Sequence, residues 1–174
     1  MRVLLVSPRF HGYHAAIATS LAARGHLVST HLYDHHGGVA GRGWHQLRHQ
    51  LPQRIGAGNP LALVREQTGR AVAAVRSARA QAVVVVKGDT LDADFWDAID
   101  GLPRVTWLYD EVRRTRWTRE RLAGIGPVAT YSKHDAADLQ AYAIDVRHLP
   151  LAFDHRLVPQ PTRSEEHTSE LQSH

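Results

Sequence analysis

A regular alternation of short apolar runs with helical patterns is the feature of this sequence that most constrains its fold. Continuous apolar runs of this kind are typical of strands in a parallel sheet that is covered on both faces. The pattern predicts an α/β fold of Rossmann-like type, with an open, mainly parallel sheet and helices on both faces. The second run alternates more than the others, which places it nearer an edge of the sheet. In chain order the runs are Val3–Val6, Leu27–Tyr33, Ala82–Val86, Val105–Tyr109, Val128–Tyr131 and a short one near Val146–Leu149.

The helical patterns lie between these runs, and several have recognisable ends. A four-residue apolar repeat after the first run stops at Gly25, a suitable C-cap. Asn59-Pro60 matches an N-cap followed by proline at the first helical position. Ser132 with Asp135 fits a capping box that would open a helix after the fifth run.

Two segments do not follow the pattern. The stretch from Asp34 to Asn59 is rich in Gly, His, Arg and Gln and receives no assignment. The segment Arg163–His174 has one leucine and no hydrophobic period, and Arg163 to Ser173 back-translates codon for codon into a common sequencing adapter read in frame. We therefore expect a Rossmann-like domain at residues 1–162 and a disordered, non-native tail at residues 163–174.

The composition excludes several classes of protein. The chain has no cysteine, which rules out a disulfide framework, a thiolate nucleophile and a Cys-based zinc site. No apolar run approaches the length of about 20 residues that a membrane helix needs, and no cleavage site follows the N-terminal run, so we expect a cytoplasmic protein without a membrane span. Leaving out the tail removes one Arg and three Glu and raises the formal charge from +4 to +6. Nearly all of that charge is arginine, as is typical of GC-rich bacterial genomes.

The loops that follow the strands carry the candidate site. Ligands of open parallel sheets bind outside the carboxyl ends of the strands, so the residues just past each run are the ones to inspect. Lys87, Asp89 and Asp110 directly follow apolar runs, where a purely structural turn has little need for charge. We predict a ligand site at this edge of the sheet. The other polar residues there are His11, Gly12 and His14 after the first run, Glu111 after the fourth, and Ser132 and His134 after the fifth.

Individual roles at this edge follow from residue chemistry. A neutral imidazole suits proton abstraction near pH 7, so His11 is a candidate general base or hydroxyl-positioning group. Gly12 either lets backbone N–H groups approach a hydroxyl or phosphate, or merely serves the turn. Asp110 and Glu111 point to opposite sides of an extended strand end, so they do not form a two-carboxylate pair. One would face the cleft while the other pairs with arginine.

Three other kinds of site are disfavoured. No G-x-G-x-x-G or P-loop follows the first run, which argues against a standard dinucleotide or nucleoside-triphosphate site. His11, His14, His35 and His36 lack an established zinc spacing, so we expect no metal. The arginines between Arg113 and Arg121, with Trp117 among them, resemble a nucleic-acid patch, but no nucleic-acid module accompanies them. A solvated helix face, a phosphate-bearing ligand or a neighbouring domain explains them as well.

Several segments, taken in order, resemble the N-terminal half of CgeB-type (spore-maturation-protein-like) glycosyltransferases. They are "MRVLLVSPRFHGYHAAIATSLAARGHLVSTHLYD", "VVVVKGDTL", "VTWLYDEVRRTRWT", "GPVATYSKHD" and "RHLPLAFD", and the resemblance spans Met1 to Asp154. The family is similar to GT-B glycosyltransferases, in which two Rossmann-like domains face each other across a cleft. The resemblance implies that this half holds the acceptor, while a C-terminal domain, absent here, binds the nucleotide-sugar donor.

By the same resemblance, the cleft residues would be His11, Gly12, His14, Lys87, Asp89, Asp110, Glu111, Ser132 and His134, with Asp110 and His11 as catalytic candidates. No cofactor is implied besides the nucleotide-sugar co-substrate. The fragment alone would be inactive, with the missing domain as its intramolecular partner and an unidentified acceptor. The alternative is a stand-alone Rossmann-like module that binds a small molecule or regulates without catalysis.

Overall fold

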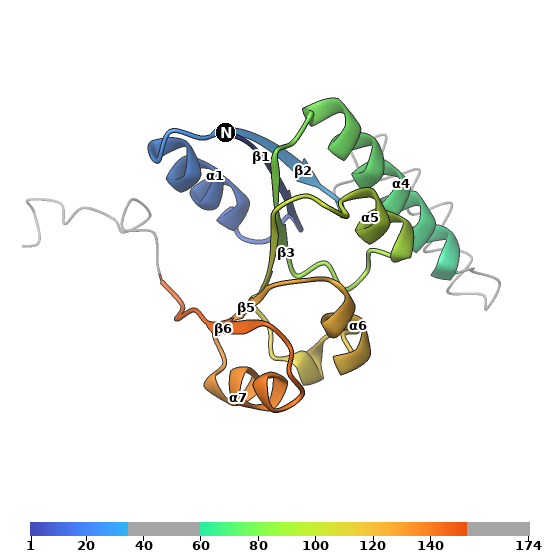
Figure 1. Cartoon of the computed structure of the whole chain (residues 1–174). Helices are drawn as coiled ribbons and strands as arrows, with labels where there is room; N and C mark the ends of the chain where they lie inside the picture. The colour runs from blue at the N-terminus through green and yellow to red at the C-terminus, as the bar shows by residue number, and fades with distance from the viewer. Residues whose placement is uncertain (35–59, 153–174) are drawn as a thin grey trace, which may run out of the picture.

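The computed structural model describes residues 1–34 and 60–152, and within them the predicted sheet is present (Figure 1). Six parallel strands lie in the order β2-β1-β3-β4-β5-β6. The predicted α/β, Rossmann-like fold is therefore confirmed, and β2 is an edge strand, as its alternating pattern suggested. The strands are β1 (Arg2–Ser7), β2 (Leu27–Leu32), β3 (Ala82–Val86), β4 (Arg104–Leu108), β5 (Val128–Thr130) and β6 (Val146–His148).

The described helices are distributed unequally over the two faces of the sheet. Right-handed crossovers put α1, which leads from β1 outward to β2, on one face, and the helices that lead in the opposite direction on the other. Figure 1 shows α1 separated by the sheet from α4 and α5. The helices are α1 (Tyr13–Ala23), α4 (Pro60–Ala78), α5 (Ala93–Ala98), α6 (Arg119–Gly124) and α7 (Lys133–Ala141), with a 3-10 turn η2 (Val112–Arg114) after β4.

The face covered by α4 to α7 contains the hydrophobic core. One cluster joins Leu4 and Val85 of the sheet to Phe95 of α5, and a second joins Val128 to Leu139 of α7. Trp96 packs against both clusters, so they form one continuous layer. By contrast, α1 contributes no buried residue to the opposite face. Among the described residues that face is covered only in part, and Val84, Val105 and Trp107 are half-buried there.

The strand order places a switch point between β1 and β3. From β1 the chain crosses to β2 on one side, and from β3 it crosses to β4 on the other side. The loops after β1 and β3 therefore diverge and leave a crevice at the carboxyl ends of these strands. This crevice is the position at which doubly wound sheets bind ligands, and it is where the predicted edge residues Lys87 and Asp89 lie.

The helix ends agree with the predicted signals in most respects. A helix begins at Pro60, Gly25 follows α1 with a φ of 82°, and the Ser132 hydroxyl accepts the Asp135 N–H at 3.1 Å. The second half of the predicted capping box is replaced by a tertiary contact, because the Asp135 carboxylate accepts the N–H of Val112 at 3.0 Å. The tail at residues 163–174 and the unassigned stretch at residues 35–59 lie outside the described residues. Within the described parts of the chain no helix is long and apolar enough to cross a membrane.

Candidate functional site

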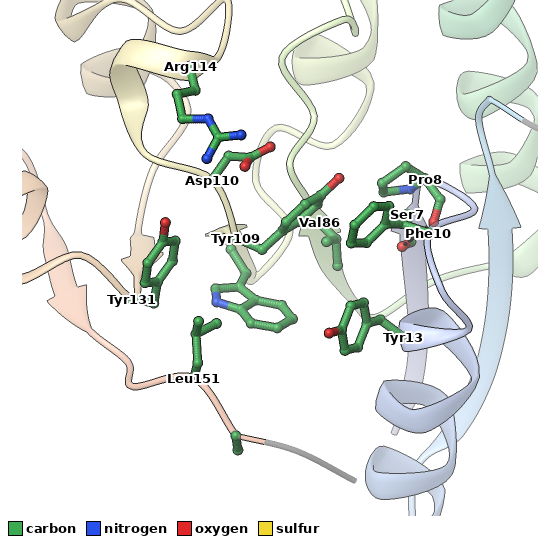
Figure 2. Close-up of a pocket in the computed structure, with 12 residues that line it drawn as sticks. Ser7, Pro8, Phe10, Tyr13, Val86, Tyr109, Asp110, Arg114, Tyr131 and Leu151 are labelled. Carbon is green, nitrogen blue, oxygen red and sulfur yellow. Dashed lines mark hydrogen bonds between the residues drawn. The ribbon is translucent and has the colours of Figure 1, made fainter. Parts of the chain in front are cut away.

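A cavity of about 310 Å³ opens at the carboxyl edge of the sheet, on the face that α1 covers in part. Figure 2 shows Phe10 and Tyr13 on one side, Tyr131 and Leu151 on the other, and Asp110 beside Arg114 at one end. We call it the aromatic cavity, because five rings contribute to its walls. Its lining residues are Ser7, Pro8, Phe10, Tyr13, Val86, Trp107, Tyr109, Asp110, Arg114, Tyr131, Leu151 and Ala152.

The strand register explains why these side chains face the same space. Val86 of β3 pairs with Trp107 of β4, and both point to the face that bears α1. Tyr109 follows two residues later on the same side. Phe10 stacks on Tyr109 with ring centroids 5.3 Å apart and on Tyr13 at 5.8 Å, so one wall is a continuous aromatic stack.

Asp110 is the one carboxylate among the residues that line the aromatic cavity, and it is paired. Its Oδ2 lies 3.3 Å from Lys87 Nζ, and both side chains are about three-quarters buried, with 23% and 26% exposure. The same ammonium group lies 5.7 Å from the centre of the Tyr109 ring. Burial, with Asp110 and Asp89 nearby, raises the pKa of Tyr109 to about 12, so this phenol is a neutral hydrogen-bonding group at physiological pH.

Glu111, the neighbour of Asp110, pairs with an arginine. Its Oε2 accepts a hydrogen bond from Arg113 Nε at 2.6 Å, and it does not line the cavity. The two neighbouring carboxylates therefore have different surroundings, although both lie beyond the end of β4, where strict strand alternation no longer applies. Asp110 faces the cavity and Glu111 pairs with arginine.

A second cavity, of about 220 Å³, lies on the other side of the aromatic stack. We call it the polar cavity. Pro8, Phe10 and Tyr109 line both cavities and form the wall between them. The remaining lining residues of the polar cavity are Arg9, Tyr33, Asp34, Gln67, Lys87, Asp89 and Thr90.

The turn Lys87-Gly88-Asp89 supplies one wall of the polar cavity and is held from several directions. The Lys87 carbonyl accepts the indole N–H of Trp117 at 2.8 Å, and the Gly88 N–H donates to the Tyr33 hydroxyl at 3.4 Å. Asp89 is only 5% exposed, and its Oδ2 accepts the N–H of Arg116 at 3.1 Å. These bonds fix the turn as a rigid part of the site.

The structure thus brings Lys87, Asp89 and Asp110 together, but it separates other predicted site residues from them. His11 is exposed, lies edge-on to Phe10 at 4.3 Å, and lines neither cavity. Gly12, at a φ of 75°, precedes α1 as its N-cap, and His14 lies one residue into that helix. Neither lines a cavity.

On the fifth loop, Ser132 caps α7 and His134 is exposed. No cluster of three or more potential metal-ligating side chains occurs within residues 1–34 and 60–152. His35 and His36, the other histidines considered for a metal, lie outside the described residues.

Sequence reasoning missed the aromatic residues, although a signal for them exists. The tripeptide Leu-Tyr-Asp occurs twice, at 32–34 and at 108–110, and each copy begins at the last residue of a strand. Tyr33, Tyr109 and Tyr131 each stand directly after a strand or within its predicted apolar run, where they were counted as core. An aromatic residue next to a charged one at a strand end is better interpreted as a cavity wall.

The arginine-rich segment is largely engaged within the domain. Arg119 makes a two-pronged contact with Asp138 at 2.8–3.1 Å, and Arg121 donates to the Leu91 carbonyl at 3.2 Å while its guanidinium lies 4.7 Å from the Trp117 ring. These contacts support the interpretation of a paired helix face. Arg114 of the same segment lines the aromatic cavity.

Comparison of the chain with family models, with curated proteins and with solved structures finds no match. The functional argument therefore depends on the geometry of the two cavities and on the sequence segments themselves.

Proposed function

We propose that this chain is the acceptor-binding half of a GT-B-type glycosyltransferase, with the acceptor held in the aromatic cavity. The observation that carries the proposal is the placement of Asp110 in that cavity, paired with Lys87 at 3.3 Å and surrounded by aromatic walls. A mainly apolar pocket with a few fixed polar groups is the usual form of a small-molecule site. The resemblance of the strand-end segments to CgeB-type enzymes supports the choice of reaction.

In the proposed reaction an acceptor hydroxyl bonds to the anomeric carbon of the donor sugar, and the bond to the nucleotide diphosphate breaks. The acceptor hydroxyl loses its proton, and Asp110 is the group placed to accept it. Lys87 holds the carboxylate in position through their ion pair. His11 is exposed outside both cavities, so it contributes only if the partner domain brings the donor against the loop after β1.

The donor is assigned to a second α/β domain, which would close over the carboxyl edge of this sheet. Arg114 lies at that edge, beside Asp110, and is placed to meet a diphosphate there (Figure 2). The arginine-rich, lysine-poor composition supports the further expectation of a bacterial enzyme. No cofactor beyond the sugar nucleotide is required.

The experiment compares this chain with the protein encoded by the uninterrupted gene. Each is incubated with a panel of nucleotide sugars, and nucleotide release is measured against a buffer blank. We expect release from the complete protein and none from this chain, because both reactants must be held together for the reaction to be accelerated. Release by this chain alone would show that the assignment of the donor to another domain is wrong.

A stand-alone binding module is the second candidate, and one observation favours it. The described residues of this domain by themselves form two adjoining cavities, of about 310 and 220 Å³. A genomic reading frame that stops near Thr162, together with ligand binding and no nucleotide release, would favour this candidate over the transferase.

A further inference from the structure

The aromatic cavity is charged at one end and mainly apolar elsewhere. Figure 2 shows its two charged side chains, Asp110 and Arg114, together at one end, away from Tyr13 and Leu151. A ligand that matches this lining carries its polar group at one end of an apolar body. A saccharide has hydroxyl groups around its whole ring, and those that faced apolar walls without a partner would weaken its binding.

The aromatic walls favour a flat ring. Phe10 lies between Tyr13 and Tyr109, with interplanar angles of 26° and 18° and ring centroids 5.8 and 5.3 Å apart. Tyr131 lies on the opposite side of the cavity (Figure 2). Phe10 and Tyr13 are 41% and 44% exposed, so part of each ring is uncovered. An aromatic ligand would cover this surface and extend the stack, and stacked aromatic pairs contribute more than the area they bury.

The volume of the cavity limits the size of this ring system. An engineered apolar cavity of about 150 Å³ in another protein holds one benzene ring. The aromatic cavity, at about 310 Å³, therefore has room for two fused six-membered rings. A larger ring system would extend out of the cavity into solvent.

The charges at the polar end disfavour a cationic ligand. Asp110 is already paired with Lys87 at 3.3 Å, and Arg114 adds a positive charge at the same end of the cavity. Among the described residues, none of the ion pairs involves Arg114. A quaternary ammonium group, which aromatic walls can also bind, would therefore be repelled here. A phenol fits better, because its oxygen gains negative charge as it loses its proton and the two cations stabilise that charge.

The Asp110 carboxylate has one oxygen left for a ligand. Among the described residues its hydrogen bond involves only Oδ2, and Oδ1 is not one of the buried polar atoms without a partner, so Oδ1 is reachable from solvent. A phenol has a pKa of about 10 and water one of about 15.7. A carboxylate is a weak base, so it suits a phenolic hydroxyl better than an aliphatic one.

We propose that the aromatic cavity binds a flat bicyclic phenol, with its rings between Tyr131 and the Phe10 stack and its hydroxyl at Asp110 Oδ1. As the identity of the acceptor, this rests on the proposed function. In that reaction the phenolic oxygen bonds to the anomeric carbon of the sugar, and the nucleotide diphosphate leaves with the electron pair of the broken C–O bond. The phenolic proton passes to Asp110. Binding of the phenol can be measured without the donor.

The test uses the whole chain and three probes. Naphthol is the flat bicyclic phenol, decahydronaphthol has the same carbon skeleton and hydroxyl without aromatic rings, and methyl glucoside represents a saccharide. Titration calorimetry and quenching of tryptophan fluorescence report binding, since Trp107 is part of the cavity wall. We expect saturable binding of naphthol, about tenfold or more tighter than that of the other two probes.

A matched pair of variants tests the place of binding. Phe10→Leu keeps an apolar side chain but removes the central ring of the stack, so naphthol binding should weaken about threefold to tenfold. Tyr142→Leu is the control, because Tyr142 is an exposed ring at the end of α7 that lines neither cavity. A melting curve for each variant verifies its fold. Equal naphthol affinity of the two variants would refute the placement of the ligand against Phe10.

Other outcomes would overturn the ligand class itself. These are no saturable binding of naphthol, or binding of decahydronaphthol or methyl glucoside as tightly as naphthol. The complete protein separates this result from the proposed function. Naphthol binding without transfer from any nucleotide sugar would refute the transferase and leave the ligand class standing. Transfer to saccharides without naphthol binding would refute the ligand class and leave the transferase standing.

Discussion

The same tripeptide, Leu-Tyr-Asp, ends two strands of this sheet and has two different environments. At residues 32–34, Tyr33 is 3% exposed, belongs to the hydrophobic core and lines the polar cavity. At residues 108–110, Tyr109 is half-buried on the opposite face and forms the wall between the cavities. The difference arises from register. Tyr33, directly after β2, points toward α4 and α5, whereas Tyr109, directly after β4, points toward the face that α1 covers in part.

The two aspartates differ accordingly. Asp34 Oδ1 accepts the N–H of Arg9 at 2.6 Å and so holds the loop after β1, whereas Asp110 lines the aromatic cavity and forms an ion pair with Lys87. A short motif therefore specifies a cavity wall in both places, but only the packing decides which copy presents its carboxylate to the aromatic cavity. The following predictions test that difference, beginning with the largest expected effect.

If the proposed transferase function is right, Asp110→Asn in the protein encoded by the uninterrupted gene should reduce turnover about 10²–10⁴-fold, the usual contribution of a positioned proton acceptor. Glu111→Gln should change turnover little, because Glu111 pairs with Arg113, which is 81% exposed, and such pairs contribute roughly 0–1 kcal/mol to stability. Steady-state kinetics on both variants, with a melting curve for each, provide the measurement. A crippled Glu111→Gln enzyme beside a normal Asp110→Asn enzyme would mean that the wrong carboxylate has been assigned.

Gly88→Ala should destabilise the domain by about 2–4 kcal/mol, because it combines left-handed strain with a steric clash. The added Cβ would lie 2.8 Å from Val85 and 3.3 Å from Trp96. Gly101→Ala is the matched control, since Gly101 has a similar φ of 75° but open space around it, and it should cost only about 1 kcal/mol. Urea denaturation of both variants measures the difference. Equal losses would show that the turn after β3 is not tightly packed.

Alkaline pH should destabilise the domain through Tyr33 and Tyr109, and near neutral pH this effect is absent. Burial raises the pKa of Tyr109 to about 12 and that of Tyr33 further, while an unfolded tyrosine ionises near pH 10. The folded chain then retains protons that the unfolded chain loses, so stability is complete below about pH 10 and falls as the pH rises above it.

Tyr33→Phe should remove more of this pH dependence than Tyr109→Phe, because Tyr33 is the more deeply buried phenol. Thermal melts between neutral and strongly alkaline pH, together with absorbance titration of the phenolates, measure the effect. If Tyr109→Phe flattened the profile and Tyr33→Phe did not, the burial difference between the two copies of the motif would be refuted.

Much of the fold could be predicted from the sequence, because apolar runs separated by helical repeats admit few arrangements other than a covered parallel sheet. The same topology predicted that a ligand site would lie at the carboxyl edge of the sheet. Lys87, Asp89 and Asp110 were selected there because a purely structural turn after a buried strand does not require charged residues. His11 and Ser132 were selected by the same rule, but they lie outside the cavities. A loop position says nothing about which way a side chain points.

Tertiary structure alone decided how these residues are combined. The sequence by itself determined the strands and the helix starts at Pro60 and after Ser132, since these depend on local periodicity and caps. The pairing of Lys87 with Asp110, the stack of Phe10 on Tyr109 and the hydrogen bond from Trp117 to Lys87 depend on contacts between segments far apart in the chain. Such contacts are set by strand register and by left-handed turns such as Lys87-Gly88, which local patterns do not encode.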